Sequence, residues 1–229
     1  MKKILMVLTS HEDMIGTNSK TGLWIGEFTD PYYVFKDKGY TIVLASPEGG
    51  NPPIDPMSKL TEHITASNKR FMNDDFTKHA LKHTLKLSDI NASEFDAMFI
   101  PGGHGPMFDL AENTWSGQLI LSFLSQKKPV AAVCHGPAAL IKAAEMQPEI
   151  LKGKKVTGFS NAEETLVMRT GNMPYSLEDK LKALGADYRK AMVPFVSHVE
   201  VDGFLITGQN PLSANLTAKA LIDMLEGGQ

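Results

Sequence analysis

Apolar runs of strand length recur along the chain, and each is followed by glycine or proline and then by a segment of helical period. The clearest runs predict strands at residues 4–9, 41–45, 97–100, 130–133, 155–158 and 204–207. Helical periodicity predicts helices at residues 27–38, 114–126, 137–144, 177–184 and 212–226. Continuous apolar strands that alternate with helices are typical of a parallel sheet covered on both faces. We therefore expect an α/β fold.

The stretch from about residue 48 to 93 interrupts this alternation. Prolines open it at Pro52, Pro53 and Pro56, and a polar region rich in charged residues and histidine follows. Such a segment is typical of an insertion over one end of a sheet, where it serves as a cap, a dimer contact or a plain surface excursion. Nothing in the composition of the 229 residues marks a linker, so residues 1–229 are expected to form one domain that carries this insertion.

The charge balance excludes one class of partner. The chain has 23 Lys and Arg residues against 26 Asp and Glu, a formal charge of -3, so no basic field attracts phosphate backbones and nucleic acid is not expected. The apolar run at residues 4–8 is too short for a signal peptide or a membrane span, which predicts a cytoplasmic protein with no membrane partner. A Walker loop and a dinucleotide fingerprint are both missing, so no nucleotide cofactor is expected.

The only cysteine, Cys134, lies between a predicted strand and a helix start made of small residues. A residue at such a turn projects from the carboxyl edge of the sheet, beside helix N–H groups that can stabilise a developing oxyanion. Cys134 is therefore a candidate nucleophile, and the alternative is a buried cysteine that behaves as a small hydrophobe. His135 follows it directly, and at a sharp turn its ring can lie beside the sulfur and accept the thiol proton.

Three acidic residues are candidates to assist Cys134 and His135 in moving protons. An imidazole that accepts a proton needs its other nitrogen held by an acid, and Glu163 and Glu164 both follow the strand predicted at 155–158. Sequence position does not choose between them, and a solvated helix start is the alternative for either. Glu27 lies in the first turn of a predicted helix, where the helix dipole makes an acid commonplace. If it instead points toward Cys134, a partly dry pocket would raise its pKa and let it move protons at neutral pH.

The loop Pro101-Gly102-Gly103-His104-Gly105 follows another predicted strand. Its glycines allow close approach of the backbone, so Gly103 and the N–H of His135 are candidate oxyanion donors and His104 is a candidate substrate contact. The alternatives are a tight turn and a hydrogen-bonded structural histidine. His79 and His83 have the i, i+4 spacing of metal ligands, but no third ligand is evident, so no metal is expected.

Together these motifs resemble the PfpI superfamily, which is related to the class I glutamine amidotransferases. The resemblance rests on residues 131–137, the loop 101–105, Gly26-Glu27, Gly158-Phe159-Ser160 and Glu164-Thr165, and it spans nearly the whole chain. It is greatest to the heat-inducible holding chaperones that are also glutathione-independent glyoxalases (glyoxalase III). It implies a flavodoxin-like three-layer α/β/α sandwich, usually a homodimer. It also implies a triad of Cys134, His135 and Glu164, with Glu27 as a separate glutamate near the thiol.

The resemblance implies a lyase of the glyoxalase III type (D-lactate dehydratase), which converts methylglyoxal to lactate without a cofactor. In that reaction the Cys134 thiolate adds to the aldehyde, and Glu27 and His135 move a proton between the two carbons. A thiolate at neutral pH requires a pKa below the ordinary value of about 8.5 for cysteine. The alternatives are a stress-induced holding chaperone with a redox-sensitive cysteine and a cysteine peptidase. Expected partners are therefore a small dicarbonyl substrate and unfolded or glycated proteins, the latter through deglycase chemistry.

Overall fold

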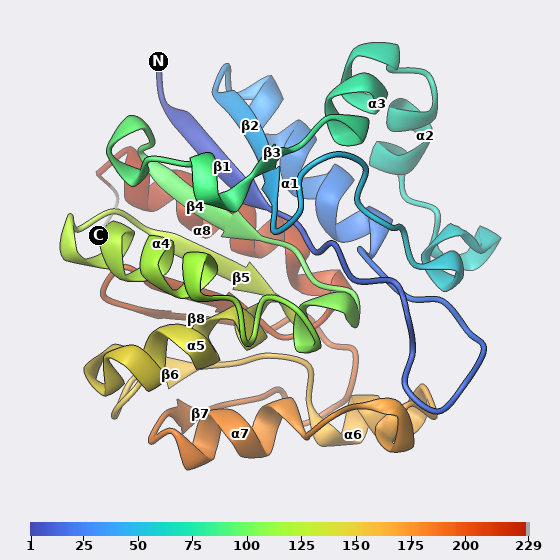
Figure 1. The fold of residues 1–229 in the computed structure, drawn as a ribbon, viewed down its shortest axis with the longest axis vertical. Helices are drawn as coiled ribbons and strands as arrows, with labels where there is room; N and C mark the ends of the chain where they lie inside the picture. Colours follow the sequence, from blue (N-terminus) through green and yellow to red (C-terminus); the bar gives the residue numbers. More distant parts are fainter. Residues whose placement is uncertain (228–229) are drawn as a thin grey trace.

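A seven-stranded sheet runs through the centre of the computed structural model, which describes residues 1–227, and helices lie on both sides of it (Figure 1). In spatial order its strands are β3 (Leu85–Lys86), β2 (Thr41–Ser46), β1 (Lys3–Val7), β4 (Ala97–Ile100), β5 (Val130–Val133), β9 (Leu205–Gly208) and β8 (Val199–Asp202). Every neighbouring pair is parallel except β8 and β9, which are antiparallel. The expected mainly parallel sheet is confirmed.

The first strand shows why its sequence is apolar throughout. Side chains alternate between the two faces of a strand, so Ile4 and Met6 enter one core while Leu5 and Val7 enter the other. A strand buried on both faces therefore needs a continuous apolar run. One core lies under α1 (Ile25–Asp37) and α8 (Ala214–Leu225), and the other lies under α4 (Thr114–Ser125) and α5 (Ala139–Met146) (Figure 1). This arrangement is the predicted flavodoxin-like three-layer sandwich.

The strand predicted at 155–158 differs from expectation. It shortens to β6 (Lys155–Val156) and pairs with β7 (Asp187–Tyr188) in a separate two-stranded sheet. The place beside β5 is taken by β9, and β8, which the pattern did not predict, forms the edge. The sequence of β8 is Val-Glu-Val-Asp, which lacks the apolar run of the central strands because an edge strand is half exposed.

The inserted segment packs against the outer side of α1. It contains α2 (Ala66–Met72), α3 (Asp75–Lys82) and the edge strand β3 (Figure 1). Thr65 donates to Asp30 at 2.8 Å, and Lys36 lies 2.8 Å from Asp74. Near its start, the carbonyl of Pro53 accepts the N–H of Leu23, just before α1. The insertion therefore fixes the helix that carries Glu27 from two directions.

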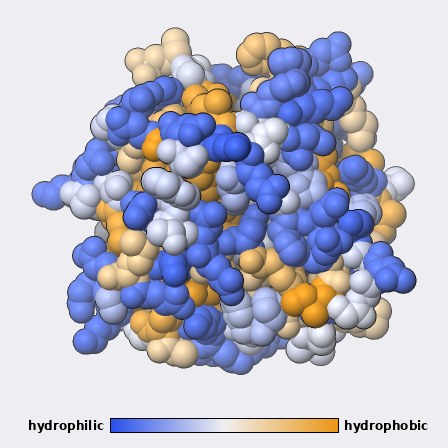
Figure 2. All heavy atoms as spheres, viewed as in Figure 1, coloured by the Kyte–Doolittle hydropathy of each residue, from blue (hydrophilic) through white to orange (hydrophobic). Residues whose placement is uncertain are grey.

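The remaining helices and the surface complete the fold. Two short helices, α6 (Asn161–Leu166) and α7 (Leu177–Ala183), lie beyond the far edge of the sheet, near the small β6–β7 sheet (Figure 1). Figure 2 shows a face that is largely hydrophilic, with apolar residues in small separate groups. Over residues 1–227, none of the helices is both long and apolar enough to cross a membrane.

Candidate active site

The backbone at Cys134 is strained in the way that the strand-to-helix turn requires. Strand β5 ends at Val133, and Cys134 then adopts a left-handed conformation with φ of 61°. Its N–H donates to the carbonyl of Gly208 at 2.9 Å, and its carbonyl accepts the N–H of Phe159 at 2.8 Å. A non-glycine residue in this region costs about 1–3 kcal/mol, so these two bonds hold a conformation that the chain would otherwise avoid. The strain turns the thiol away from the strand direction.

Two glycines allow neighbouring backbone to come close to this turn. A Cβ at Gly136 would overlap the carbonyl oxygen of Ile100, and one at Gly103 would overlap the carbonyl oxygen of Gly22. Gly103 also has a φ of 89°, where a side chain is strained whatever the space. The backbone N–H of Gly103 lowers the pKa of the Cys134 thiol, against the larger effect of burial. The N–H of Gly103 is the group expected from the sequence as an oxyanion donor.

The ring of His135 lies between the thiol and an acid. Its Nδ1 lies 3.4 Å from Sγ of Cys134, and its Nε2 lies 2.6 Å from Oε2 of Glu164. The ring of Phe159 packs against it with centroids 4.5 Å apart, and only 1% of His135 is exposed. Both ring nitrogens are therefore committed in opposite directions, one to the sulfur and one to the carboxylate.

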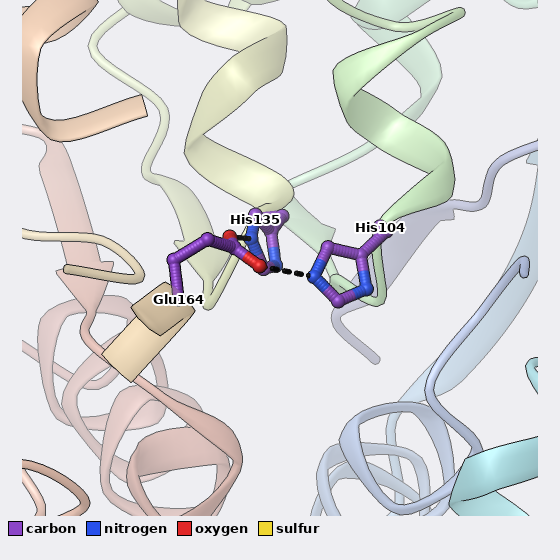
Figure 3. Close-up of side chains that lie close together, drawn as sticks. All are labelled: His104, His135 and Glu164. Carbon is purple, nitrogen blue, oxygen red and sulfur yellow. Dashed lines mark hydrogen bonds and ion pairs between the residues drawn. The ribbon is translucent and has the colours of Figure 1, made fainter. Parts of the chain in front are cut away.

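A second imidazole holds the same carboxylate. The Nε2 of His104 lies 2.8 Å from Oε1 of Glu164, so one carboxyl group bridges two histidines from different loops (Figure 3). The two imidazole rings have centroids 4.3 Å apart. His104 is expected from its loop to contact the substrate or oxyanion, but in the structure its Nε2 is turned to Glu164.

The neighbouring acid, Glu163, has a different set of contacts. Its carboxylate accepts from the backbone N–H of Ser160, which completes a capping box at the start of α6. The other oxygen accepts from the side-chain amides of Gln209 and Asn210 at 3.0 and 2.9 Å. Of the two acids that sequence position left open, Glu164 is the one that meets His135.

The charges within this cluster are set by burial and by the two histidines. Burial raises the pKa of Glu164, but the imidazoles of His135 and His104 outweigh it and hold the carboxyl pKa below its usual range. Burial, and next the nearby His104, lower the pKa of His135. At neutral pH the acid is ionised and the His135 ring is neutral. Because Glu164 accepts the Nε2 proton, the lone pair of His135 points at the thiol from Nδ1.

Glu27 lies on the other side of the sulfur. It is fully buried in the first turn of α1, and the N–H of Gly102 donates to its Oε2 at 2.8 Å. Burial raises its pKa to about 8, although the bond from Gly102 opposes that shift. The Cys134 thiol also lowers the pKa of Glu27, and the charge of Glu27 in turn raises the pKa of the thiol. Near neutral pH, Glu27 therefore holds a proton that it can share with the sulfur.

The expectation of an easily ionised thiol is wrong for the protein without a substrate. Burial, and next the charge of Glu27, raise the pKa of Cys134 well above its usual value. The turn leads into a short 3-10 segment, Gly136–Ala138, before α5 begins, so the full dipole of the helix does not act directly on the sulfur. The arrangement favours removal of the thiol proton by His135 as the sulfur attacks, rather than a thiolate formed beforehand.

Two aromatic residues of the site, Phe159 and Phe195, were not predicted from the sequence. Phe159 packs against His135, and the ring of Phe195 lies 5.9 Å from that of Phe159. Phe159 stands in the quoted Gly158-Phe159-Ser160 motif, which is a signal that could have been used. Phe195 has a positive φ of 59°, but it lies in no motif, and only the folded chain brings it to the site.

The chain has a flavodoxin-like sandwich, and its cysteine lies at a strained strand-to-helix turn with a histidine and acids beside it. These features define a class of α/β proteins with a polar cluster at the carboxyl edge of a central strand. The chain belongs to the DJ-1/PfpI family, whose model matches residues 25–224.

One curated fungal relative and two solved structures illustrate the similarity. Glyoxalase 3 of Candida albicans is 32% identical to this chain over 237 residues, covering 99% of each. The crystal structure of glyoxalase III from Candida albicans superposes with a TM-score of 0.86 at 30% identity and covers 96% of each chain. The X-ray structure of Rapid Encystment Protein 24 kDa from Francisella tularensis superposes with a TM-score of 0.93 at 42% identity, covering 98% of this chain and 99% of that one.

Proposed function

We propose that the protein is a glutathione-independent glyoxalase that converts methylglyoxal to lactate, with Cys134 as nucleophile. The observation that carries the proposal is the 3.4 Å contact between Sγ of Cys134 and Nδ1 of His135, on a ring whose other nitrogen is held by Glu164. The full-length similarity to proteins named glyoxalase 3 and glyoxalase III supports the choice of substrate class.

The first step joins the sulfur to the aldehyde carbon of the substrate. His135 accepts the thiol proton at Nδ1 as the sulfur–carbon bond forms. The aldehyde oxygen becomes negatively charged and takes the proton of Glu27, while the N–H of Gly103 stabilises it during the attack. The product is a hemithioacetal on Cys134, a protonated His135 and an ionised Glu27.

The second step moves hydrogen between the two carbons. The carboxylate of Glu27 removes the proton from the sulfur-bearing carbon, and the protonated His135 gives a proton to the neighbouring carbonyl oxygen, which yields an enediol. Glu27 then returns its proton to the second carbon, and His135 takes the hydroxyl proton from the first. The result is a thioester of lactate, with His135 protonated and Glu27 ionised.

Water completes the cycle. Glu27 removes one proton from a water molecule that attacks the thioester carbonyl, and His135 protonates the departing sulfur. Lactic acid leaves, and the thiol, the neutral ring and the protonated Glu27 return to their starting states. The sum is one dicarbonyl and one water converted to one hydroxy acid, so no external thiol, oxidant or reductant is consumed.

The test is incubation of the reduced protein with methylglyoxal and no added thiol, followed by assays of dicarbonyl loss and of each lactate enantiomer. We expect lactate to appear in proportion to dicarbonyl consumed, and Cys134→Ser to abolish it. His79→Ala, an exposed change on α3, serves as the matched control and should leave the rate unchanged. Equal turnover by Cys134→Ser would remove the thiol from the reaction.

A protein that stays intact and reduced but does not turn over methylglyoxal would favour the holding-chaperone or peptidase alternatives. The homodimer, the cytoplasmic location and action on unfolded or glycated proteins stay predictions of the sequence. Aggregation assays with Cys134→Ala separate chaperone activity from the glyoxalase reaction, because an apolar surface that binds unfolded proteins does not need the sulfur.

A further inference from the structure

Three potential metal ligands converge beside the thiol. His104, His135 and Glu164 each offer an atom within 4.8 Å of the others, and they come from the loops after β4 and β5 and from α6 (Figure 3). Within residues 1–227, this is the single group of three or more such residues that is close enough to share an ion. Cys134 is not part of it, because it faces the opposite nitrogen of His135.

The chemistry of the three groups matches a divalent transition metal. Two imidazoles and one carboxylate, with a fourth position left open, form the ligand set of several zinc enzymes. The three ligand atoms lie within 4.8 Å of one another, with Glu164 2.8 and 2.6 Å from the two imidazole nitrogens, so binding a common ion at about 2.0–2.2 Å requires small shifts of all three side chains. The side chains of His104 and Glu164 are 11% and 12% exposed, which leaves the ion an approach from solvent.

We propose that His104, His135 and Glu164 bind a Zn²⁺-like ion and that the bound ion inhibits the enzyme. In the structure each imidazole turns its Nε2 to Glu164, and a bound ion would take the place of the protons held between them. On each imidazole, the proton moves from Nε2 to Nδ1 as Nε2 donates its lone pair to the ion.

Inhibition follows from that change of tautomer. In the metal-free site the Nδ1 lone pair of His135 faces the sulfur at 3.4 Å and can accept its proton. With the ion on Nε2, Nδ1 carries the proton and can only donate. The ion and the thiol thus compete for a single imidazole. The inhibitory half of the proposal rests on the function proposed above, whereas the binding half does not.

The binding test uses Co²⁺, whose visible absorption reports coordination without any activity measurement. We expect the metal-free protein to bind one equivalent of Co²⁺. His104→Ala should weaken binding at least about tenfold, because loss even of an outer-shell partner costs 10–100-fold. Glu164→Gln should do the same and serves as a second variant, with circular dichroism to check that each is folded. His79→Ala, on the exposed histidine pair of α3, is the matched control and should bind normally.

Zn²⁺ should inhibit lactate formation over the concentration range in which it displaces Co²⁺, and a chelator should restore the rate. Cys134→Ser should keep the Co²⁺ spectrum. A near-ultraviolet sulfur-to-cobalt band that vanishes in Cys134→Ser would place the ion on the thiol and overturn the proposal. Equal binding by folded His104→Ala, or no Co²⁺ absorption with an active enzyme, would also overturn it. Co²⁺ binding by a protein that lacks glyoxalase activity would support the site and remove only the proposed function.

Discussion

The N–H of Gly102 donates to Oε2 of Glu27 at 2.8 Å, while Oε1 of the same carboxyl group is buried with no hydrogen-bond partner among the described residues. The bonded oxygen fixes the orientation of the side chain. We expect the proton that Glu27 holds near neutral pH to lie on this unpartnered oxygen, in a carboxyl group whose charge raises the pKa of the nearby Cys134. Burying an oxygen without a hydrogen-bond partner lowers the stability of the folded protein, so this oxygen is consistent with a catalytic role for Glu27.

Glu27→Gln should lower lactate formation by about 10²-fold or more, because an amide of the same shape can accept from Gly102 but cannot exchange a proton. The variant should stay folded. Above about pH 8, where Glu27 is ionised, the variant should also alkylate faster at Cys134, because the charge of Glu27 contributes to the raised pKa of the thiol. Steady-state kinetics and the pH dependence of iodoacetamide labelling check both effects. Unchanged turnover would remove Glu27 from proton transfer.

The same substitution should change how stability depends on pH. The pKa of Glu27 rises from 4.5 to about 8 on folding, so the folded state binds more protons between these values and stability falls as pH rises through them. Below pH 4.5 the group is protonated in both states and has no effect. Glu27→Gln should therefore gain stability relative to the parent on going from pH 5 to pH 8.5. The largest expected gain in the free energy of unfolding is ~5 kcal/mol, because each unit of the pKa rise from 4.5 to about 8 corresponds to 1.36 kcal/mol. Urea unfolding that gives the same difference at both pH values would contradict this.

Two adjacent carboxyl groups offer a matched pair of variants. Glu164→Gln should lower kcat by about 10²-fold or more, because it removes the charge that faces a protonated His135 and disturbs its tautomer. Glu163→Gln alters a helix cap and contacts with Gln209 and Asn210, so it should lower Tm while leaving kcat within a few-fold. Kinetics and thermal melts of both variants check the assignment. The reverse pattern would make Glu163 the acid that acts.

His104 is expected to act as a positioning residue with a signature in the pH profile. His104→Ala removes a donor to Glu164 and an influence that lowers the pKa of His135, so kcat should fall about tenfold and the acid limb of kcat/KM should move to higher pH. His104→Gln can still donate to Glu164, and should recover part of kcat while the limb stays shifted. If the acid limb of kcat/KM does not move in either variant, His104 contributes only by packing and not through the pKa of His135.

The close backbone contact at Gly136 gives a test of the turn itself. Gly136→Ala should destabilise the protein by about 2–3 kcal/mol, because its Cβ would overlap the carbonyl oxygen of Ile100. Gly171→Ala has open space around it and should change stability by less than about 0.5 kcal/mol. Denaturant unfolding compares the two. A small effect at Gly136 would mean that the loop after β4 can move away from the turn.

The sequence by itself determined the elements whose cause is local. Continuous apolar runs such as β1 can be satisfied only by burial on both faces, and the small residues after Cys134 allow a turn that larger ones would block. The layers of the fold and the position of Cys134 at its turn followed from those signals.

Only the tertiary structure decided the partners, because pairing and burial depend on segments that are distant in the chain. Lys155–Val156 does not join the main sheet, because Leu205–Gly208 pairs with β5 in its place and Lys155–Val156 pairs with Asp187–Tyr188. His104 turned to Glu164 because two loops and a helix meet there. The raised pKa of Cys134 comes first from burial and then from the carboxyl of Glu27, and no local pattern predicts either for this sulfur. Local propensity can therefore specify where a reactive group lies, whereas its protonation is set by the neighbours that the fold supplies.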